Sequence, residues 1–533
     1  MVRTVNLTMR FGSRVLFNDI NLKLDQHKRY GLIGANGAGK TTFLKILSGQ
    51  IEEFDGEVNI GSGLKVGVLG QNQFAFEDFT ITDAVLFGNK RLFDAIKEKE
   101  KIYETGDFED DAVNNRLADL EVICCEEDPT YEYDVNIGKI LENVGISAEF
   151  HLELMSSLDS ADKFKVLLAQ VLYPKPDVLF LDEPTNNLDI ETIGWLENEL
   201  QRHEGTLVVI SHDRHFLNAV VTNILDVDYQ KIREFTGTYD DWYIAANVIA
   251  RQLEADNSKK EKEKSELEAF VRRFSANASK AKQATSRQKK LDKLEIENIK
   301  PSSRRDPSIV FSPKRQMGDE ALELKNISHS YGDNEVLKDV SLKFEPGERV
   351  AIIGGNGVGK TTLLKIMMEE LKPTSGEVTW GATVENSYFP QDTADVISGD
   401  GTLYDWLRAY DPKRDIAEIR NCLGRMLFNG EEQEKSVVNI SGGEKHRMML
   451  SKLMLQNGNF LVLDEPSNHL DLEAIVALGE GLLGFKGNVI CVSHDRELLD
   501  AFANRIIEFR ENGTYVDFKG TYEQFAEEKA KGL

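Results

Sequence analysis

The sequence predicts an α/β protein that contains two copies of one domain, joined by a long α-helical segment. The main observation is an internal repeat, because motifs recur in the same order along the 533 residues. GANGAGKTT at Gly34–Thr42 recurs as GGNGVGKTT at Gly354–Thr362, and LDEPTNNLD at Leu181–Asp189 recurs as LDEPSNHLD at Leu463–Asp471. The first pair is 320 residues apart and the second pair 282, so the first copy carries 38 extra residues between its two motifs.

The second observation is the segment between the copies. Residues 238–300 contain neither Gly nor Pro and are rich in strong helix formers, which predicts long helices. The small polar cluster at Ser275–Ser279 can turn the chain, and Pro301 ends the run. We therefore expect a first domain at 1–240, a helical-hairpin linker at 241–318 and a second domain at 319–533.

The extra residues of the first copy are expected to form an inserted arm at about 89–128. The stretch KRLFDAIKEKEKIYE predicts a helix there. Thr105–Asp134 holds eleven acidic residues and one basic residue, Arg116. So acidic a segment is a poor ligand for RNA, and two interpretations stay open: contact with a basic protein, or a solvated loop.

Composition disfavours several classes of function. The net charge of −26 opposes diffuse binding to nucleic acid, so any RNA contact needs a locally basic element. No apolar run approaches the length of a membrane helix, so no membrane association is expected. The four cysteines show neither metal-ligand spacing nor a disulfide framework, which favours the reducing cytoplasm.

A locally basic element does occur, inside the predicted linker. Between Phe270 and Leu291 there are seven basic residues and no acidic one. Basic side chains on a helix can bind phosphates of RNA, whereas the alternative is a solvated helical spacer. The candidate RNA-binding residues are Arg272, Arg273, Lys280, Lys282, Arg287, Lys289 and Lys290.

Each copy contains a phosphate-binding loop. The pattern GxxxxGK[ST] follows an apolar strand-like stretch and precedes a helix-like stretch, which is the context that such a loop needs. Its glycines let backbone N–H groups approach the β- and γ-phosphates of ATP, its Lys supplies positive charge, and its first Thr can bind Mg²⁺. The candidate residues are Gly34, Asn36, Gly37, Gly39, Lys40, Thr41 and Thr42, with Gly354, Asn356, Gly357, Gly359, Lys360, Thr361 and Thr362 in the second copy.

Groups for metal binding and hydrolysis follow later strands of each copy. An Asp at the carboxyl edge of a sheet can orient Mg²⁺, and the Glu that follows it can polarise an attacking water. A His at the next strand end can contact the γ-phosphate, although a lone His is more often a packing residue. The candidate pairs are Asp182 and Asp464 for Mg²⁺, Glu183 and Glu465 for the water, and His212 and His494 for the phosphate.

A second anion site is predicted from ISGGEKHR in the second copy. Ser441, Gly442 and Gly443 place a hydroxyl and backbone N–H groups at the start of a helix. One domain cannot bring this segment onto its own phosphate loop. The motif therefore implies a second domain that faces it.

In this order, Phe11-Gly12 or Tyr331-Gly332, the phosphate loop, a Gln, SGGE, LDEP-N-LD and SHDR resemble the ATP-binding-cassette ATPases. The duplicated form with a helical linker is similar to the ABC-F proteins, which act on ribosomes. The linker sequence FVRRFSANASKAKQATSRQKKLDK resembles the YbiT-type bacterial subgroup. The resemblance implies two P-loop ATP-binding-cassette domains joined by a long α-helical hairpin linker.

The resemblance also implies ligands and partners. Two ATP molecules with Mg²⁺ would lie head-to-tail between the cassettes of a monomer. Phe11 and Tyr331 would stack on adenine, whereas Gln71 and Gln391 would contact Mg²⁺ and the γ-phosphate. Members of the family bind the ribosomal exit site, so the large subunit with its rRNA and L1 stalk, and peptidyl-tRNA beside the linker, are the expected partners.

One departure from the family pattern is large. Counting back from the Asp of each LDEP motif pairs Ser441–Gly443 with Asp159, Ser160 and Ala161, so the first signature is degenerate. We therefore expect unequal sites. Site one would combine Lys40 with the intact signature, and site two would combine Lys360 with the degenerate one. The alternative is that the degenerate helix still supplies enough backbone N–H groups.

Three functions remain in competition. The first is a soluble ATPase that binds the ribosome in an ATP-dependent way and regulates or rescues translation. The second is an ATP-hydrolysing subunit that energises a separate membrane transporter, although such subunits rarely need so long a basic hairpin. The third is a non-catalytic ATP switch, against which the presence of both Glu183 and Glu465 argues.

Overall fold

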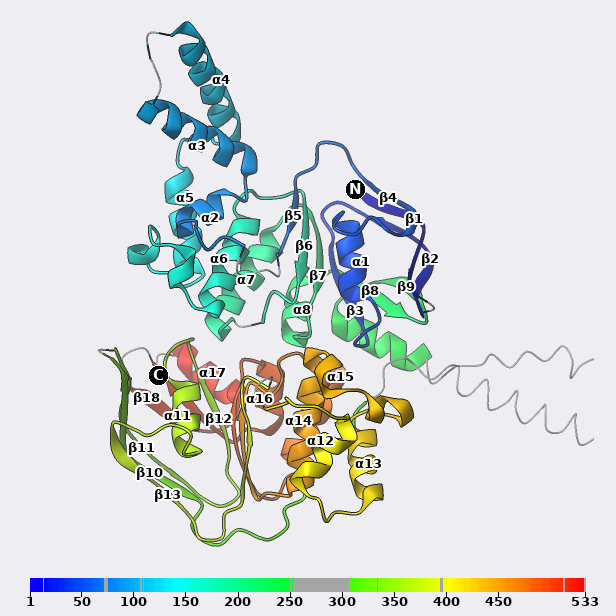
Figure 1. Ribbon diagram of the computed structural model, residues 1–533, viewed down its shortest axis with the longest axis vertical. Helices are drawn as coiled ribbons and strands as arrows, with labels where there is room; N and C mark the ends of the chain where they lie inside the picture. The colour runs from blue at the N-terminus through cyan, green and yellow to red at the C-terminus, as the bar shows by residue number, and fades with distance from the viewer. Residues whose placement is uncertain are drawn as a thin grey trace, which may run out of the picture.

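The computed structural model describes residues 1–12, 14–70, 75–105, 108, 110–186, 188–249, 252, 306–332, 334–393, 396–510 and 513–531. Two α/β domains face each other, the first in the upper half of Figure 1 and the second in the lower half. Each combines a three-stranded antiparallel sheet with a six-stranded, mostly parallel sheet. The predicted fold class is confirmed. Gln71 and most of the predicted linker, including its seven basic residues and Ser275–Ser279, lie outside the described residues.

The first cassette opens with an antiparallel sheet of order β2-β1-β4 and continues with a sheet of order β5-β6-β7-β3-β8-β9, in which β9 alone runs antiparallel. Its elements are β1 (Val2–Phe11), β2 (Arg14–Leu24), β3 (Arg29–Gly34), α1 (Lys40–Leu47), β4 (Asp55–Ile60), β5 (Val66–Val68), α2 (Ile81–Leu86), α3 (Lys90–Thr105), α4 (Asp111–Glu127), α5 (Tyr133–Asn143), η1 (Ala148–Phe150), η2 (Met155–Ser157), α6 (Ser160–Leu172), β6 (Val178–Asp182), α7 (Ile190–Arg202), β7 (Thr206–Ile210), α8 (Arg214–Val220), β8 (Asn223–Asp228) and β9 (Lys231–Thr236). A helix begins at residue 239 and is described to residue 249.

The second cassette repeats this order, with sheets β11-β10-β13 and β14-β15-β16-β12-β17-β18. Its elements are β10 (Leu322–Tyr331), β11 (Asn334–Phe344), β12 (Arg349–Gly354), α11 (Lys360–Met367), β13 (Ser375–Trp380), β14 (Asn386–Phe389), α12 (Leu403–Tyr410), α13 (Ile416–Arg425), η3 (Gly430–Glu434), η4 (Val437–Asn439), α14 (Gly442–Gln456), β15 (Phe460–Asp464), α15 (Leu472–Leu483), β16 (Asn488–Val492), α16 (Arg496–Phe502), β17 (Arg505–Phe509), β18 (Tyr515–Lys519) and α17 (Tyr522–Lys531).

The central strands explain where the functional side chains gather. VLFLD in β6, TLVVI in β7 and RYGLIG in β3 are almost wholly buried, as expected of parallel strands covered on both faces. They pair in parallel, so their carboxyl ends meet at one edge of the sheet. The phosphate loop follows β3, Asp182 ends β6 and His212 follows β7. These groups are therefore neighbours in space.

The helices α3 and α4 span the stretch to which the 38 extra residues are assigned. They pack side by side and project from the first cassette at the top of Figure 1. Leu92, Ala95, Leu120 and Cys124 are buried between this pair and its base. An ion pair joins the helices, because Arg116 Nη2 lies 2.6 Å from Glu98 Oε2.

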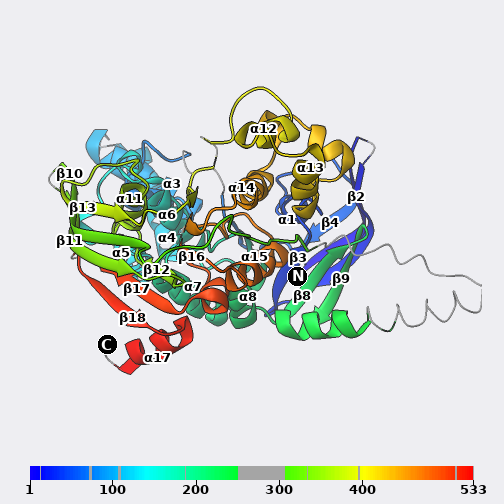
Figure 2. The same ribbon diagram turned by 90° about the horizontal axis from the view of Figure 1, so that it is seen from below.

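The two cassettes pack against each other, and the view from below in Figure 2 shows their antiparallel sheets at opposite ends, β10, β11 and β13 on the left and β2 and β4 on the right. Leu472, the first residue of α15 in the second cassette, is a member of the hydrophobic core of the first cassette. In the reciprocal contact, Ile190 at the start of α7 packs against the core of the second cassette. Within the described part of the chain, every helix is too short or too polar to span a lipid bilayer.

Candidate active site

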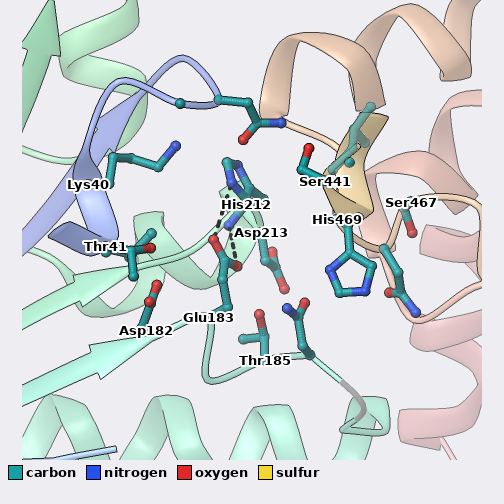
Figure 3. A pocket seen from close by; sticks show the side chains of 18 of the residues that line it. Lys40, Thr41, Asp182, Glu183, Thr185, His212, Asp213, Ser441, Ser467 and His469 are labelled. Carbon is teal, nitrogen blue, oxygen red and sulfur yellow. Dashed lines mark hydrogen bonds and ion pairs between the residues drawn. The ribbon is translucent and has the colours of Figure 1, made fainter. Parts of the chain in front are cut away.

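A cavity of about 530 Å³ lies between the cassettes and combines motifs from both. The first cassette contributes Lys40, Thr41, Asp182, Glu183 and His212, and the second contributes its intact signature. Figure 3 shows these side chains converging on one space, with Ser441 opposite Lys40 and His212. The lining residues also include Phe11, Asn36, Gly37, Gly39, Thr42, Ser441, Gly442 and Gly443. These residues are those predicted for site one, and Glu465 and His494, which the sequence assigns to site two, line the same cavity.

The phosphate loop of site one is shaped by its glycines. The backbone of Gly34 has φ +157° and that of Gly39 has φ +100°, a conformation that side chains disfavour. A Cβ on Gly34 would lie 2.7 Å from the carbonyl oxygen of Val227 on the neighbouring strand. Lys40, the first residue of α1, donates from Nζ to the carbonyl oxygen of Gly34 at 2.7 Å. Its ammonium is thereby held across the loop, where phosphate oxygens would bind.

The corresponding loop of the second cassette has the same geometry. Gly354 has φ +140° and a Cβ on it would lie 2.4 Å from the carbonyl oxygen of Phe509. Lys360 Nζ donates to the carbonyl oxygens of Gly354 and Gly355, both at 2.7 Å. The remaining predicted residues Asn356, Gly357, Gly359, Thr361 and Thr362 lie in this loop and in α11.

Glu183 and His212 are paired in site one. His212 Nε2 lies 3.2 Å from Glu183 Oε1, and the backbone N–H of His212 donates to Glu183 Oε2 at 3.3 Å. In the second cassette His494 Nε2 lies 3.3 Å from Glu465 Oε1. Both glutamates have left-handed backbones, with φ +51° and +48°. A left-handed backbone is unusual for a residue other than Gly, and such backbone strain recurs at functional sites.

Burial sets the protonation of these groups. Removal from water raises the pKa of Glu183 to about 7 and that of Glu465 to about 8, although the nearby Lys40 or Lys360 lowers each. Burial lowers the pKa of His212 and brings that of His494 to about 3, so both imidazoles are neutral. A carboxylate with a pKa near neutrality can accept a proton from water, and a neutral imidazole can donate one hydrogen bond.

The second cassette brings together oxygen ligands of the kind that Mg²⁺ prefers. Both carboxylate oxygens of Asp464 are buried, with the hydroxyl of Thr361 beside them. Burial raises the pKa of Asp464 to about 6, which a bound cation would reverse. Thr361 Oγ1 lies 3.5 Å from Gln391 Oε1, so three predicted metal ligands are close together. In the first cassette, Figure 3 places Thr41 beside Asp182.

The two signature helices present different groups to an anion. In α14, Ser441 and Glu444 form a capping box, and a Cβ on Gly443 would lie 2.7 Å from the carbonyl oxygen of His469. In α6, the carboxylate of Asp159 accepts the N–H of Asp162 at 2.8 Å. A negative charge therefore sits at the helix start that should face the phosphates of site two.

The aromatic residues expected to stack on adenine are available for that role. Phe11 and Tyr331 are 55% and 53% exposed, which is unusual for large apolar side chains. Phe11 lines the site-one cavity at the end of β1. Tyr331 holds the same position at the end of β10.

Several residues of the cavity were missed by reasoning from the sequence. The largest group comes from the second cassette, on the loop between β15 and α15 and on the loop before α16. The sequence did contain a signal for these residues, because most of them lie in or beside the LDEP-N-LD and SHDR motifs, which both recur. Within these motifs, however, only the positions of Asp182, Glu183 and His212 suggested chemistry. The missed residues are Leu16, Thr185, Asn186, Ile193, Ile210, Asp213, Glu444, Arg447, Ser467, Asn468, His469, Ile475 and Asp495.

Asp213 and Asp495 form a buried acidic pair where the two SHDR loops meet. Burial raises the pKa of both carboxyls, and the charge of Asp213 raises that of Asp495 further, to about 7. His215, Glu197, Arg496 and Glu497 are the other charged groups that face the pair. Closing the cassettes should therefore take up a proton, because separated carboxyls would have ordinary pKa values.

We expect the ATP-bound closed state to weaken as the pH rises through about 7, because a raised pKa in the closed state favours it only at lower pH. The fraction of molecules in the closed state can be measured by energy transfer between two fluorophores placed on either side of the interface. The measurement uses the double variant Glu183→Gln with Glu465→Gln, in which those two carboxyls no longer titrate. Asp495→Asn keeps an acceptor for the N–H of Leu498 and should flatten the pH dependence. His215→Gln is the control that removes titration of the neighbouring His215 imidazole. An identical pH slope in Asp495→Asn would contradict the assignment.

Comparison with known proteins identifies the family. The model of the family described as ABC transporter matches residues 17–186 and 337–468, and an extension model of that name matches 225–311. The probable ATP-binding protein YbiT of Escherichia coli O157:H7 is 43% identical over the whole of both chains. ABC transporter F family member 5 of Arabidopsis thaliana is 33% identical over 99% of this chain and 77% of its own.

Two further comparisons agree. The energy-dependent translational throttle protein EttA of Haemophilus influenzae is 32% identical over 98% of this chain and 94% of its own. The solved structure of RNase-L Inhibitor has a TM-score of 0.63 at 17% identity, covering 99% of this chain and 92% of its own, which supports the fold. The chain therefore belongs to the ABC-F family of ATP-binding-cassette ATPases, and it is an ATP hydrolase.

Proposed function

We propose that this ATPase binds the ribosome in its ATP-bound, closed form and releases it after hydrolysis, thereby regulating or rescuing translation in the cytoplasm. The single observation that carries the proposal is the cavity of site one, which is complete only when the cassettes meet. A protein whose ATP site is assembled from two domains has two shapes, and ATP selects one of them. The affinity for a large partner can then depend on whether ATP is bound.

The residues of site one suggest how the cycle proceeds. Lys40 and the loop N–H groups bind the β- and γ-phosphates, and Ser441 with the N–H groups of Gly442 and Gly443 binds the γ-phosphate from the other cassette. Glu183 orients a water and accepts its proton, while His212 holds the carboxylate and faces the phosphate. Mg²⁺, held by Thr41 and Asp182, would neutralise charge on the phosphates. Once the phosphate bond is cleaved, the link between the cassettes is lost.

The ribosome is the proposed partner for three reasons. EttA is named a translational throttle, and it is related to this chain along almost the full length. The segment Phe270–Leu291 supplies the concentrated positive charge that a protein of net charge −26 needs for RNA. The arm of α3 and α4 projects away from the cassettes, and its acidic stretch Thr105–Asp134 is suited to a basic ribosomal protein such as one at the L1 stalk. Contacts with rRNA and peptidyl-tRNA through the linker belong to the same proposal.

Charge reversal in the linker tests the partner. Changing Arg272, Arg273, Lys280 and Lys282 to Glu should leave ATP hydrolysis by the free protein near normal, because these residues are remote in sequence from every phosphate-binding motif. Co-sedimentation with 70S ribosomes in ATP should weaken, and its salt dependence should flatten, since each lost phosphate contact removes about 0.7–0.9 from the log–log slope for simple polyelectrolytes.

The control is the same number of reversals in the mixed-charge stretch before it, for example at Lys259, Lys260, Lys262 and Lys264. Ribosome affinity that is unchanged by the first set across a salt series would establish the linker as a spacer. In that case the cassette surfaces or the arm would have to carry the RNA contact.

A further inference from the structure

The start of the linker is built into the back of site one. We define the linker root as residues 239–249, the helix that Figure 1 shows in green at the boundary between β9 and α15. Tyr239 and Trp242 are 6% and 5% exposed. Together with Leu472 of the second cassette they line a small cavity whose other wall contains Lys40 and His212. The linker root thus packs directly behind the phosphate-binding and γ-phosphate-facing groups.

A second contact joins the linker root to both cassettes through one side chain. Arg214, two residues after His212, donates from Nε to Asp240 Oδ1 at 2.7 Å. Its Nη1 donates to Glu497 Oε1 of the second cassette, and its guanidinium lies 5.7 Å and 5.8 Å from the ring centres of Tyr239 and Tyr243. Arg214 therefore links the loop of His212, the root of the linker and the opposite cassette.

Site two has a counterpart that lacks this link. The helix α17 repeats the linker root, because GTYEQF at 520–525 corresponds to GTYDDW at 237–242. Its Phe525 belongs to the core of the second cassette, against which Tyr522 and Ile190 of the first cassette also pack. The equivalent arginine, Arg496, instead approaches His215 and Glu197 of the first cassette, at 3.2 Å and 3.7 Å. Among the described residues, Arg496 makes no hydrogen bond to α17, whereas Arg214 makes one to the linker root.

We propose that the linker root positions His212 and its loop for hydrolysis at site one, acting through Arg214, so that the rate at site one depends on how the linker is held. This proposal rests on hydrolysis at site one, as proposed above, and does not depend on ribosome binding. A partner that holds the linker would shift Asp240. The ion pair between Asp240 and Arg214 would then move the loop that carries His212. Asp240 and Arg214 are positioning residues, because neither lines the site-one cavity.

Asp240→Ala in the full-length protein is the test, and Asp241→Ala is its matched control. Asp241 accepts the backbone N–H of Thr238 at 2.9 Å at the start of the same helix, whereas Arg214 pairs with Asp240, so Asp241 reports the effect of helix stability alone. Asp240→Ala should lower kcat by roughly two- to thirtyfold with KM for ATP unchanged, the range of coupling through packed networks. Asp241→Ala, and Glu523→Ala at the equivalent place in α17, should keep the wild-type kcat.

A double-mutant cycle decides whether the effect passes through Arg214. Asp240→Ala combined with Arg214→Gln should be no slower than Arg214→Gln alone. Fully additive losses, an unchanged kcat in Asp240→Ala, or an equal loss in Asp241→Ala would each overturn the proposal. Glu183→Gln separates the premise from the inference: if it leaves kcat unchanged, site one is not hydrolytic, whereas a large loss there with a normal Asp240→Ala rejects the linker root alone.

Discussion

Replacing Glu183 and Glu465 together by Gln is expected to lower the rate of ATP hydrolysis by roughly 10²–10⁴-fold, the usual contribution of a general base. Glutamine keeps the size of the side chain but cannot accept a proton. The raised pKa of about 7 at Glu183 and about 8 at Glu465 places each carboxyl where it can take a proton from water near neutral pH. Single-turnover measurements of phosphate release would report the loss directly.

Binding of ATP should survive the double substitution. The Lys, Thr and Asp of both sites remain, and it is these groups that the phosphates and the metal would contact. Equilibrium binding of a fluorescent ATP analogue should therefore be close to wild type, and the closed state should persist on ribosomes and slow translation. Glu199→Gln, an exposed position on α7, is the matched control. Hydrolysis at the wild-type rate in the double variant would show that neither glutamate activates the water.

Much of this architecture could be predicted because its signals are local and duplicated. The phosphate loops need Gly34 and Gly354 to let a neighbouring strand approach, so the glycines are visible in the sequence before the strand is known. The strands that end at Asp182 and Asp464 are short apolar runs, which a parallel sheet requires. Because each motif occurs twice in the same order, a chance match could be set aside.

The sequence could not reveal pairs that exist only because two surfaces meet. Asp213 looked like an ordinary residue of SHDR, and its partner Asp495 is 282 positions away. Each also caps the helix that follows it, so either alone would be explained as a local feature. The placement of His469 in site one depends likewise on the position of one cassette against the other. The assignments of Gln71 and of the basic linker residues remain predictions.

Glu183→Gln alone is expected to cost more activity than Glu465→Gln, because the two sites are capped by different helices. Site one is faced by Ser441 and two glycines, whereas the equivalent helix start in the first cassette carries Asp159. Loss of a well-placed donor to the transition state typically slows a reaction by about 10²-fold or more, so the inequality should be measurable in steady-state kinetics. Equal losses in the two single variants would mean that the degenerate signature is adequate.

Exchanging the signatures turns this asymmetry into a stronger test. Gly442→Ser with Gly443→Ala should inactivate site one, because a Cβ at position 443 would lie 2.7 Å from a backbone oxygen at His469 and would force the loop away. The reverse exchange, Asp159→Ser with Ser160→Gly and Ala161→Gly, removes a negative charge and opens the helix start. It should raise the hydrolysis that remains in Glu183→Gln, where site two acts alone. If that remaining rate does not rise, the weakness of site two lies outside its signature, and the contacts of Lys165 and Asp189 near Lys360 become the next positions to change.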